Sequence, residues 1–522
     1  MNEKPMDQIV RGTGVTASEK KLIEIGEKTF LNLWSYPNTY IDKKQNGQGR
    51  GKELCDLLVV CGDDVIIFSD KCISWPEDNE DINLSWARWY RRAIESSVKQ
   101  IRGAARWIIQ YPDRVFLDQA CTKNLPAKFP PPERIRVHGV AVAMGANGAC
   151  KKYFNDNSGT FIIAPALKGR SHINSEDPGY LPFTIGDVDP DGPFVHVFDT
   201  VSLNVIFKER DTIADFVDYL VRRAILIREE KLVIAHGEED LVAHFLRFVG
   251  PDGRHAFTNG EGKTLAGDDK LVIADGMYEN FIVNDQYKAK KIADSISYFW
   301  DDLIGQFTKH ILAGTSYSMD GEPPLGEKAE PGLRIMAKVN RVERRLLSQA
   351  FLDAIKTAEA SGKNRYFRTF LPGETMEDRQ TAFVLLILGY PPFLDEKGGY
   401  EHYRKARVAF LQTYCMSVLY EYRDLTQVVG IGIDASSKIT GRKGGSEDMV
   451  AVSDVEWTDQ AIADILRARE ELQIMVEKPK QFIHARAEEY PNLQDLKSSE
   501  GNISRQQRRF RDRQARKPGT SN

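Results

Sequence analysis

The sequence predicts an α/β protein in which a mixed sheet flanked by helices is followed by a mainly helical C-terminal region. Two apolar runs lie on either side of Gly62-Asp63, a dipeptide typical of hairpin turns. Strand and helix patterns then alternate as far as residue 230, which is typical of an α/β domain. Helical periodicity dominates residues 340–480 and predicts the C-terminal helices.

The first helix is expected to begin at Thr16, because Thr16-Ala-Ser-Glu19 has the pattern of a capping box. Apolar residues recur with helical period as far as Trp34, and Tyr36-Pro37 ends the pattern. A polar loop at 43–52 then leads into the hairpin. The elements expected after the hairpin are a helix at about 85–110, strands within 135–144, 160–167 and 194–207, and a helix at 211–227.

These elements predict four segments. Residues 16–230 form an α/β domain and residues 235–330 a linking α/β region of unassigned role. Residues 331–495 form a mainly helical domain, and residues 496–522 a disordered basic tail. The C-terminal region is expected to select substrate, or to bind a second copy of the chain or another protein.

Composition excludes several classes of protein. The formal charge is −4, so a polyanion contact would have to come from local basic clusters. The six cysteines have no metal-ligand spacing, and three of them lie in or beside apolar runs, which favours a reducing cytoplasm. No run approaches the length of a membrane span, and the first residues lack the apolar core of a signal peptide. A cytoplasmic protein without a membrane partner is therefore expected.

The hairpin brings an acid and a lysine together. If Gly62 and Asp63 form a two-residue loop, Asp56 lies opposite Ser69 on the neighbouring strand. Lys71 is then a diagonal neighbour of Asp56 on the same face. Both faces are otherwise mostly apolar, so helices are expected on both sides of the sheet. A charge pair in such surroundings is costly unless it is matched, which favours a functional site.

An acid on one strand, a second strand that ends in acid-x-Lys, and helices before and after resemble the PD-(D/E)xK restriction-endonuclease-like superfamily. The nearest resemblance is to its Mrr-like and NERD-like members. It covers residues 17–110 well and 17–230 more weakly, and it leaves the C-terminal half unmatched. The resemblance implies a PD-(D/E)xK-like mixed sheet in the segment 16–230.

The same resemblance implies a nuclease that depends on Mg²⁺ or Mn²⁺. Carried over, Asp56 would be a metal ligand and Lys71 the lysine that positions the attacking water. Glu27 would be the first-helix glutamate that often joins the site, and Gln100 resembles a glutamine found in the helix after the lysine. Carboxylate oxygens suit a hard Mg²⁺ ion, and a lysine offsets charge that builds on the phosphate.

The sequence departs from the family at one position. Two residues before Lys71 the family has Asp or Glu, and this chain has Ser69. Asp70 is adjacent, but strand alternation directs it to the other face unless a bulge intervenes. Glu27 or Glu53 would then have to supply the missing carboxylate.

The basic tail is a second candidate site. Arg505, Arg508, Arg509, Arg511 and Arg513 could contact nucleic-acid phosphates. The leading hypothesis is therefore a metal-dependent endonuclease acting on DNA, in bacterial defence or DNA maintenance. The alternative is a nuclease-like binding or scaffolding module that has lost catalysis at Ser69.

Each candidate also has a structural reading. Asp56 and Lys71 would form an ion pair at the end of a sheet, and Glu27 would lie on the solvated side of a helix. Gln100 would be an ordinary helix residue, and the basic tail a solvated chain end.

Overall fold

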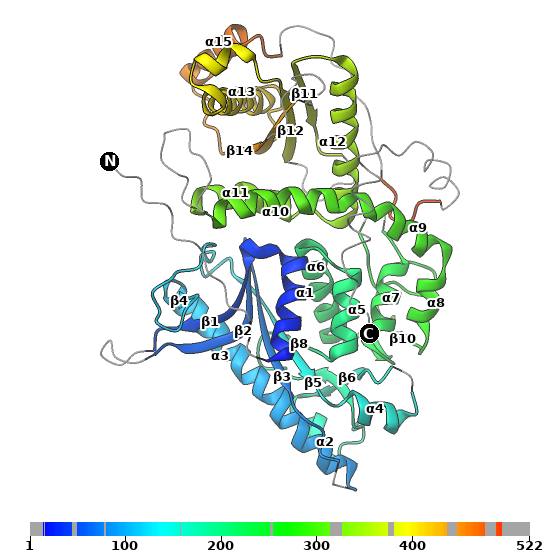
Figure 1. Ribbon diagram of the computed structural model, residues 1–522. Coiled ribbons are helices and arrows are strands. Elements are labelled where there is room, and N and C mark those ends of the chain that lie inside the picture. The colour runs from blue at the N-terminus through cyan, green and yellow to red at the C-terminus, as the bar shows by residue number, and fades with distance from the viewer. Residues whose placement is uncertain are drawn as a thin grey trace. The chain divides into compact units, whose positions relative to one another are not determined.

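The computed structural model describes residues 14, 16–43, 50–77, 80–156, 158–250, 254–313, 326–373, 380–435, 446–475 and 487–492. The chain divides into two compact units (Figure 1). The N-terminal unit spans Ile9–Tyr287, and the C-terminal unit holds the described residues from Lys288 onward. Residues 235–287 therefore belong to the same unit as the predicted domain at 16–230.

The N-terminal unit is built on a six-stranded mixed sheet with the strand order β4-β1-β2-β3-β5-β8. Neighbours from β4 to β3 are antiparallel, and β5 and β8 continue the sheet parallel to β3. The strands are β1 (Ser35–Ile41), β2 (Lys52–Cys61), β3 (Asp64–Cys72), β4 (Val115–Phe116), β5 (Arg136–Met144) and β8 (Val195–Phe198). The mixed sheet predicted from the sequence is confirmed.

Helices cover both faces of this sheet. They are α1 (Ala17–Trp34), α2 (Ile82–Tyr90), the π-helical turn η1 (Arg91–Glu95), α3 (Ser96–Gln110), α5 (Thr200–Glu209) and α6 (Ile213–Arg228). On α1, a Cβ added at Gly26 would lie 2.8 Å from Leu57 Cδ2. On the opposite face, a Cβ at Gly139 would lie 2.7 Å from Ile101 Cγ2 of α3. Both helices therefore pack closely against the sheet.

The predicted helix boundaries are largely confirmed, with one correction. Thr16 caps α1 by accepting a hydrogen bond from the backbone N–H of Glu19. The strand predicted at 194–207 is wrong in its second half, because β8 ends at Phe198 and α5 follows. The side chain of Asp199 accepts two backbone N–H groups of the first turn of α5, and such an N-cap starts a helix rather than continuing a strand.

A second sheet of four strands completes the N-terminal unit, in the order β10-β9-β6-β7. Its strands are β6 (Ile162–Lys168), β7 (Thr184–Asp187), β9 (Leu232–Ala235) and β10 (Leu271–Ile273). The remaining helices of this part of the chain are η2 (Pro112–Arg114), α4 (Asn147–Phe154), η3 (Gly169–Ile173), α7 (Glu238–Arg247), α8 (Met277–Val283) and α9 (Asp285–Asp294), which crosses the unit boundary.

The C-terminal unit contains the predicted helices and also a sheet that the sequence did not predict. The helices are η4 (Ser295–Ser297), α10 (Tyr298–Leu312), α11 (Gly326–Ala337), α12 (Arg341–Ser361), η5 (Pro392–Glu396), α13 (Gly399–Glu421) and α15 (Asp459–Glu471). The sheet has the order β11-β12-β13-β14, with β12 parallel to β13. Its strands are β11 (Arg365–Phe370), β12 (Thr381–Leu388), β13 (Gln427–Asp434) and β14 (Glu447–Ser453).

Two expectations concern the solvent and the chain end. None of the helices in the described ranges is both long enough and apolar enough to span a bilayer. The predicted basic tail at 496–522, with Arg505, Arg508, Arg509, Arg511 and Arg513, lies outside the described residues.

Candidate active site

The candidate site lies where the six-stranded sheet splits. β2 and β3 pair from Cys61↔Asp64 to Leu57↔Phe68, which confirms the two-residue turn and the predicted register. Beyond Leu57 the two strands stop pairing with each other. β2 remains paired with β1 as far as its first residue, and β3 remains paired with β5 as far as its last. We call this divergence of β2 from β3 the fork, and Asp56 is the first residue of β2 inside it.

Asp56 joins the two arms of the fork. Its carboxylate Oδ2 accepts a hydrogen bond from the backbone N–H of Asp70 at 2.7 Å and lies 3.7 Å from Lys71 Nζ. Asp56 is buried, and this burial raises the pKa of its carboxyl to about 6, although Lys71 and the Asp70 N–H act in the opposite direction. The predicted proximity of Asp56 and Lys71 is therefore confirmed. A buried carboxyl group whose pKa is shifted by burial and by a specific charged partner is a candidate functional residue.

Ser69 faces α3, on the same side as the Asp56–Lys71 pair. Its hydroxyl donates a hydrogen bond to Gln100 Oε1 at 2.9 Å and lies 3.1 Å from Ser97 Oγ. Gln100 Nε2 in turn donates to the backbone carbonyl of Leu54, at 3.5 Å. Gln100 thus contacts both arms of the fork, β3 through Ser69 and β2 through Leu54.

Asp70 points to the other face of the sheet, as strand alternation predicts. The hydroxyl of Ser18, in the first turn of α1, donates a hydrogen bond to Asp70 Oδ2. The other oxygen, Oδ1, is buried and has no hydrogen-bond partner among the described residues. Burial raises the pKa of this carboxyl and the charge of Glu19 adds to the effect, while Ser18 and Lys71 lower it. An acid without a full set of partners therefore lies directly beside the Asp56–Lys71 pair.

The two glutamates expected to supply a further carboxylate lie on different elements, Glu53 on β2 and Glu27 on α1. Glu53 is exposed, accepts a hydrogen bond from Asn38 Nδ2 at 3.0 Å, and carries a charge that raises the pKa of Asp56. Glu27 is half-buried on α1, eight residues after Glu19, which corresponds to about 12 Å along the helix axis. The charge of Glu19, in the first turn of α1, raises the pKa of Asp70.

Ser18 and Glu19 were missed by sequence reasoning, and Asp70 was set aside because of its face. The capping pattern at Thr16 indicated which residues form the first turn of α1. Thr16 fixes the first turn of α1, and that turn carries Ser18 and Glu19 to the end of β3.

The side chains that could act as metal ligands decide how well the fork suits a divalent cation. Within the described ranges, His, Cys, Asp and Glu form no group of three or more that could hold a metal ion. The hydroxyl of Ser69, on the face of Asp56 and Lys71, donates a hydrogen bond to Gln100. The carboxylates present are Asp56 and Asp70, and Mg²⁺ is commonly bound through one or two carboxylates while it keeps several waters.

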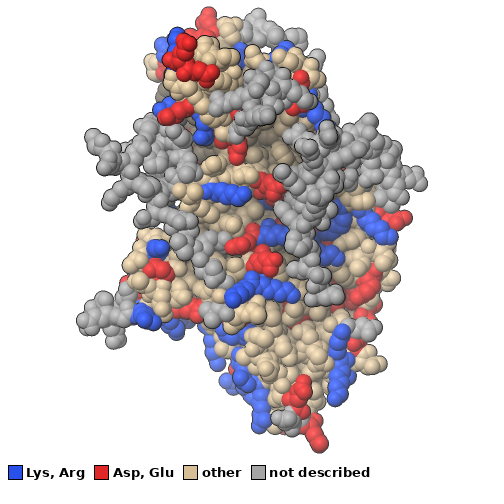
Figure 2. All heavy atoms as spheres, in the orientation of Figure 1, with Lys and Arg blue, Asp and Glu red and all other residues tan. Residues whose placement is uncertain are grey.

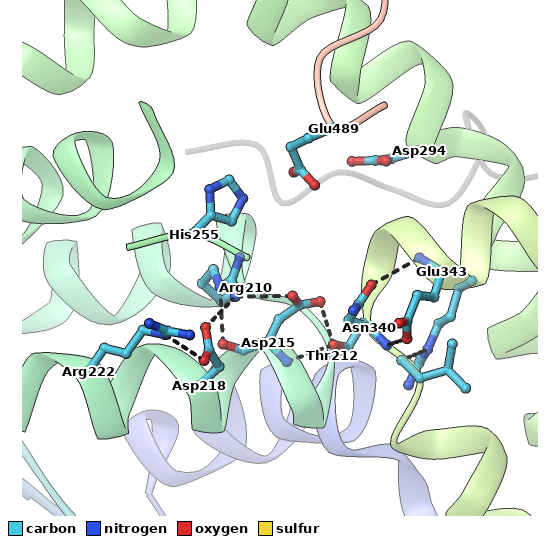
Figure 3. Close-up of polar contacts among 12 residues, drawn as sticks. Arg210, Thr212, Asp215, Asp218, Arg222, His255, Asp294, Asn340, Glu343 and Glu489 are labelled. Carbon is cyan, nitrogen blue, oxygen red and sulfur yellow. Dashed lines mark hydrogen bonds and ion pairs between the residues drawn. The ribbon is translucent and has the colours of Figure 1, made fainter. Parts of the chain in front are cut away.

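A second polar cluster, at the start of α6, has a structural role (Figure 3). Arg210 pairs with Asp215 at 3.1 Å and with Asp218 at 3.5 Å, and Arg222 pairs with Asp218 at 2.8 Å. Thr212 caps the helix by accepting the backbone N–H of Asp215. Two arginines and two aspartates balance one another, which is expected of a stabilising network.

In the C-terminal unit, Figure 3 shows how α12 begins. Asn340 accepts the backbone N–H of Glu343 at 2.9 Å, and the Glu343 carboxylate accepts the backbone N–H of Asn340 at 3.4 Å. This reciprocal pair is a capping box, which satisfies two backbone donors at the helix start.

The chain matches no protein-family model, no curated protein and no solved structure.

Proposed function

We propose that the N-terminal unit is a metal-dependent nuclease of the PD-(D/E)xK type that hydrolyses phosphodiester bonds in DNA. The observation that carries the proposal is the pair at the fork. A buried aspartate with a raised pKa lies 3.7 Å from a lysine on the neighbouring strand. Both groups belong to strand positions at which that superfamily holds its catalytic acid and lysine.

The order of the elements supports the proposal. A helix, α1, precedes an antiparallel hairpin, and a helix follows before the parallel strand β5. The helix after the hairpin carries Gln100, which contacts both strands of the hairpin. Helices on both faces and an acid and a lysine on one face are what the resemblance implies.

Asp56 would bind a divalent cation. Asp70, whose Oδ1 has no hydrogen-bond partner among the described residues, would become the second carboxylate by turning its side chain from Ser18 to the face of Asp56 and Lys71. Glu27 and Glu53 are the alternatives for that second position. A bound Mg²⁺ or Mn²⁺ would polarise the phosphate and activate a water molecule. Lys71, which is about one-quarter exposed, would offset negative charge on the phosphate. Gln100 would hold Ser69 in place and so fix the spacing between the arms.

A second candidate function is a nuclease-like binding module without catalysis. Ser69 favours it, because a hydroxyl that already donates to Gln100 is a poor metal ligand. The absence of a three-ligand group from the described residues favours it as well. In that case the fork would be a structural remnant, and nucleic acid or a protein would still be bound.

Nicking of supercoiled plasmid separates the two functions. The chain is incubated with plasmid and Mg²⁺ or Mn²⁺, in parallel with Asp56→Asn and Lys71→Ala variants. Nicking by the natural chain and its loss in both variants support the nuclease. If the natural chain is inert with either metal, while Ser69→Asp nicks, the binding module is the correct function.

A further inference from the structure

The outer side of the helical segment α2-η1-α3 carries a row of cations. The exposed residues of this row are Arg88, Arg91, Arg92, Lys99, Arg102 and Arg106. In Figure 2, lysine and arginine atoms gather along the part of the N-terminal unit where Figure 1 places α3. We call these six residues the basic row. The chain as a whole has a formal charge of −4, so the row departs from the average composition.

Most of the charge in the basic row is not balanced by acids. Lys99 lies 4.0 Å from Glu95, and Arg102 pairs with the buried Asp189. The other four members, Arg88, Arg91, Arg92 and Arg106, form no ion pair with any described residue. Like charges at neighbouring helix positions repel one another, so a polyanionic partner would relieve the repulsion among these four arginines.

The dimensions and chemistry of the row fit the backbone of duplex DNA. From Arg88 to Arg106 the segment rises about 27 Å, a length over which a DNA strand presents several phosphates. The exposed positions between the cations are the small residues Ser96 and Gly103, and a Cβ at Gly103 would meet open space. No aromatic ring between Arg88 and Arg106 is exposed. Unpaired bases need rings to stack on, so the row suits phosphates rather than single strands.

We propose that the basic row binds the phosphate backbone of duplex DNA. The same segment faces the fork with its other side, where Gln100 contacts Ser69 and Leu54. Duplex DNA held on the row would therefore lie on the helix that covers the fork. Because the row lies on the outer side of the segment, DNA binding by the row does not require cleavage and does not depend on the proposed function.

The test is fluorescence anisotropy of a labelled 30-bp duplex at several salt concentrations in EDTA, which prevents cleavage. The variant combines Arg88→Gln, Arg92→Gln and Arg106→Gln in the full chain. The matched control combines Lys151→Gln, Lys152→Gln and Lys270→Gln, three exposed lysines of the same unit that lie outside the row. Circular dichroism and thermal unfolding verify that both proteins are folded.

The slope of log K against log salt is negative, and loss of three phosphate contacts should reduce its magnitude by about 2.7. Binding at 50 mM salt should weaken by more than about tenfold. The control should bind as the natural chain does. Equal binding by variant and control would overturn the proposal. So would tighter binding of single-stranded DNA or duplex RNA of the same length, or row-dependent binding to phosphatidylserine vesicles in place of DNA.

The outcomes also separate this inference from the proposed function. DNA binding in EDTA that depends on the basic row, without nicking in Mg²⁺ or Mn²⁺, would support DNA binding by the row and contradict the proposed nuclease activity. If the chain nicks DNA but its DNA affinity does not depend on the basic row, the nuclease activity is supported and DNA binding by the row is contradicted.

Discussion

Replacing Asp56 by asparagine should make the metal-free protein more stable at neutral pH. The carboxyl is buried, and its pKa is raised from 3.8 to about 6. Between these two values the folded state binds a proton that the unfolded state has released. Stability therefore falls as pH rises through this window, and the ionised carboxylate remains a cost above it. Asparagine removes the charge and retains an oxygen that can accept the Asp70 N–H.

The size of the effect follows from the shift. A difference of about 2.2 pKa units at about 1.36 kcal/mol per unit gives about 3 kcal/mol in favour of Asp56→Asn at pH 7. The side chain of Asp56 is only 7% exposed, so solvent screening reduces this value little. For a unit of this size, the midpoint of unfolding should rise by roughly 5 °C. Below pH 4 the natural and variant proteins should be equally stable.

The assay is calorimetric unfolding of the full chain in EDTA from pH 4 to pH 8. Asp113→Asn, at an exposed aspartate of the same unit, is the matched control and should change nothing. Added Mg²⁺ should stabilise the natural chain and leave Asp56→Asn unaffected. A lower unfolding midpoint for Asp56→Asn at pH 7, or a difference that does not vary between pH 4 and pH 7, would refute the reasoning.

Four further outcomes are expected. Lys71→Ala should reduce plasmid nicking on the order of a hundredfold or more and leave the secondary structure unchanged by circular dichroism. In a thermal-shift assay, Asp70→Asn should reduce the stabilisation by Mg²⁺ more than Glu27→Gln does. A larger effect of Glu27→Gln would identify Glu27 as the second carboxylate. Ser69→Asp should maintain or raise Mg²⁺-dependent nicking, because it restores an acid beside Lys71. Deletion of residues 500–522 should weaken DNA binding and flatten its salt dependence without unfolding the chain, and unchanged anisotropy would assign the tail to solvent.

The hairpin could be predicted because its information is local. Gly62-Asp63 allows a tight turn, and once the turn has two residues the register of both strands is fixed. The positions of Asp56, Ser69 and Lys71 on one face follow directly. The start of α1 could be predicted for the same reason, because the capping residue Thr16 lies next to the first turn in the sequence.

Other parts of the fold depend on contacts distant in sequence. Strand β1 was missed because it contains Pro37 and Asn38, which are poor strand formers. The C-terminal sheet was missed because β12 and β13, which pair in parallel, are separated by the long helix α13. The placement of Ser18 and Glu19 beside Asp70 could not be predicted, because the sequence does not reveal where the start of a helix lies along a sheet.

The split in the sheet has a mechanical consequence. Five residue pairs join β2 to β3 before the strands diverge, and beyond them contacts of side chains, rather than the backbone ladder, hold the two arms together. Asp56 lies on one arm and Lys71 on the other, and Gln100 contacts both arms. A force that spread the two arms would break the contacts of Asp56 with Lys71 and with the backbone N–H of Asp70. The spacing of the two arms and the pairing of the acid with the lysine are therefore linked.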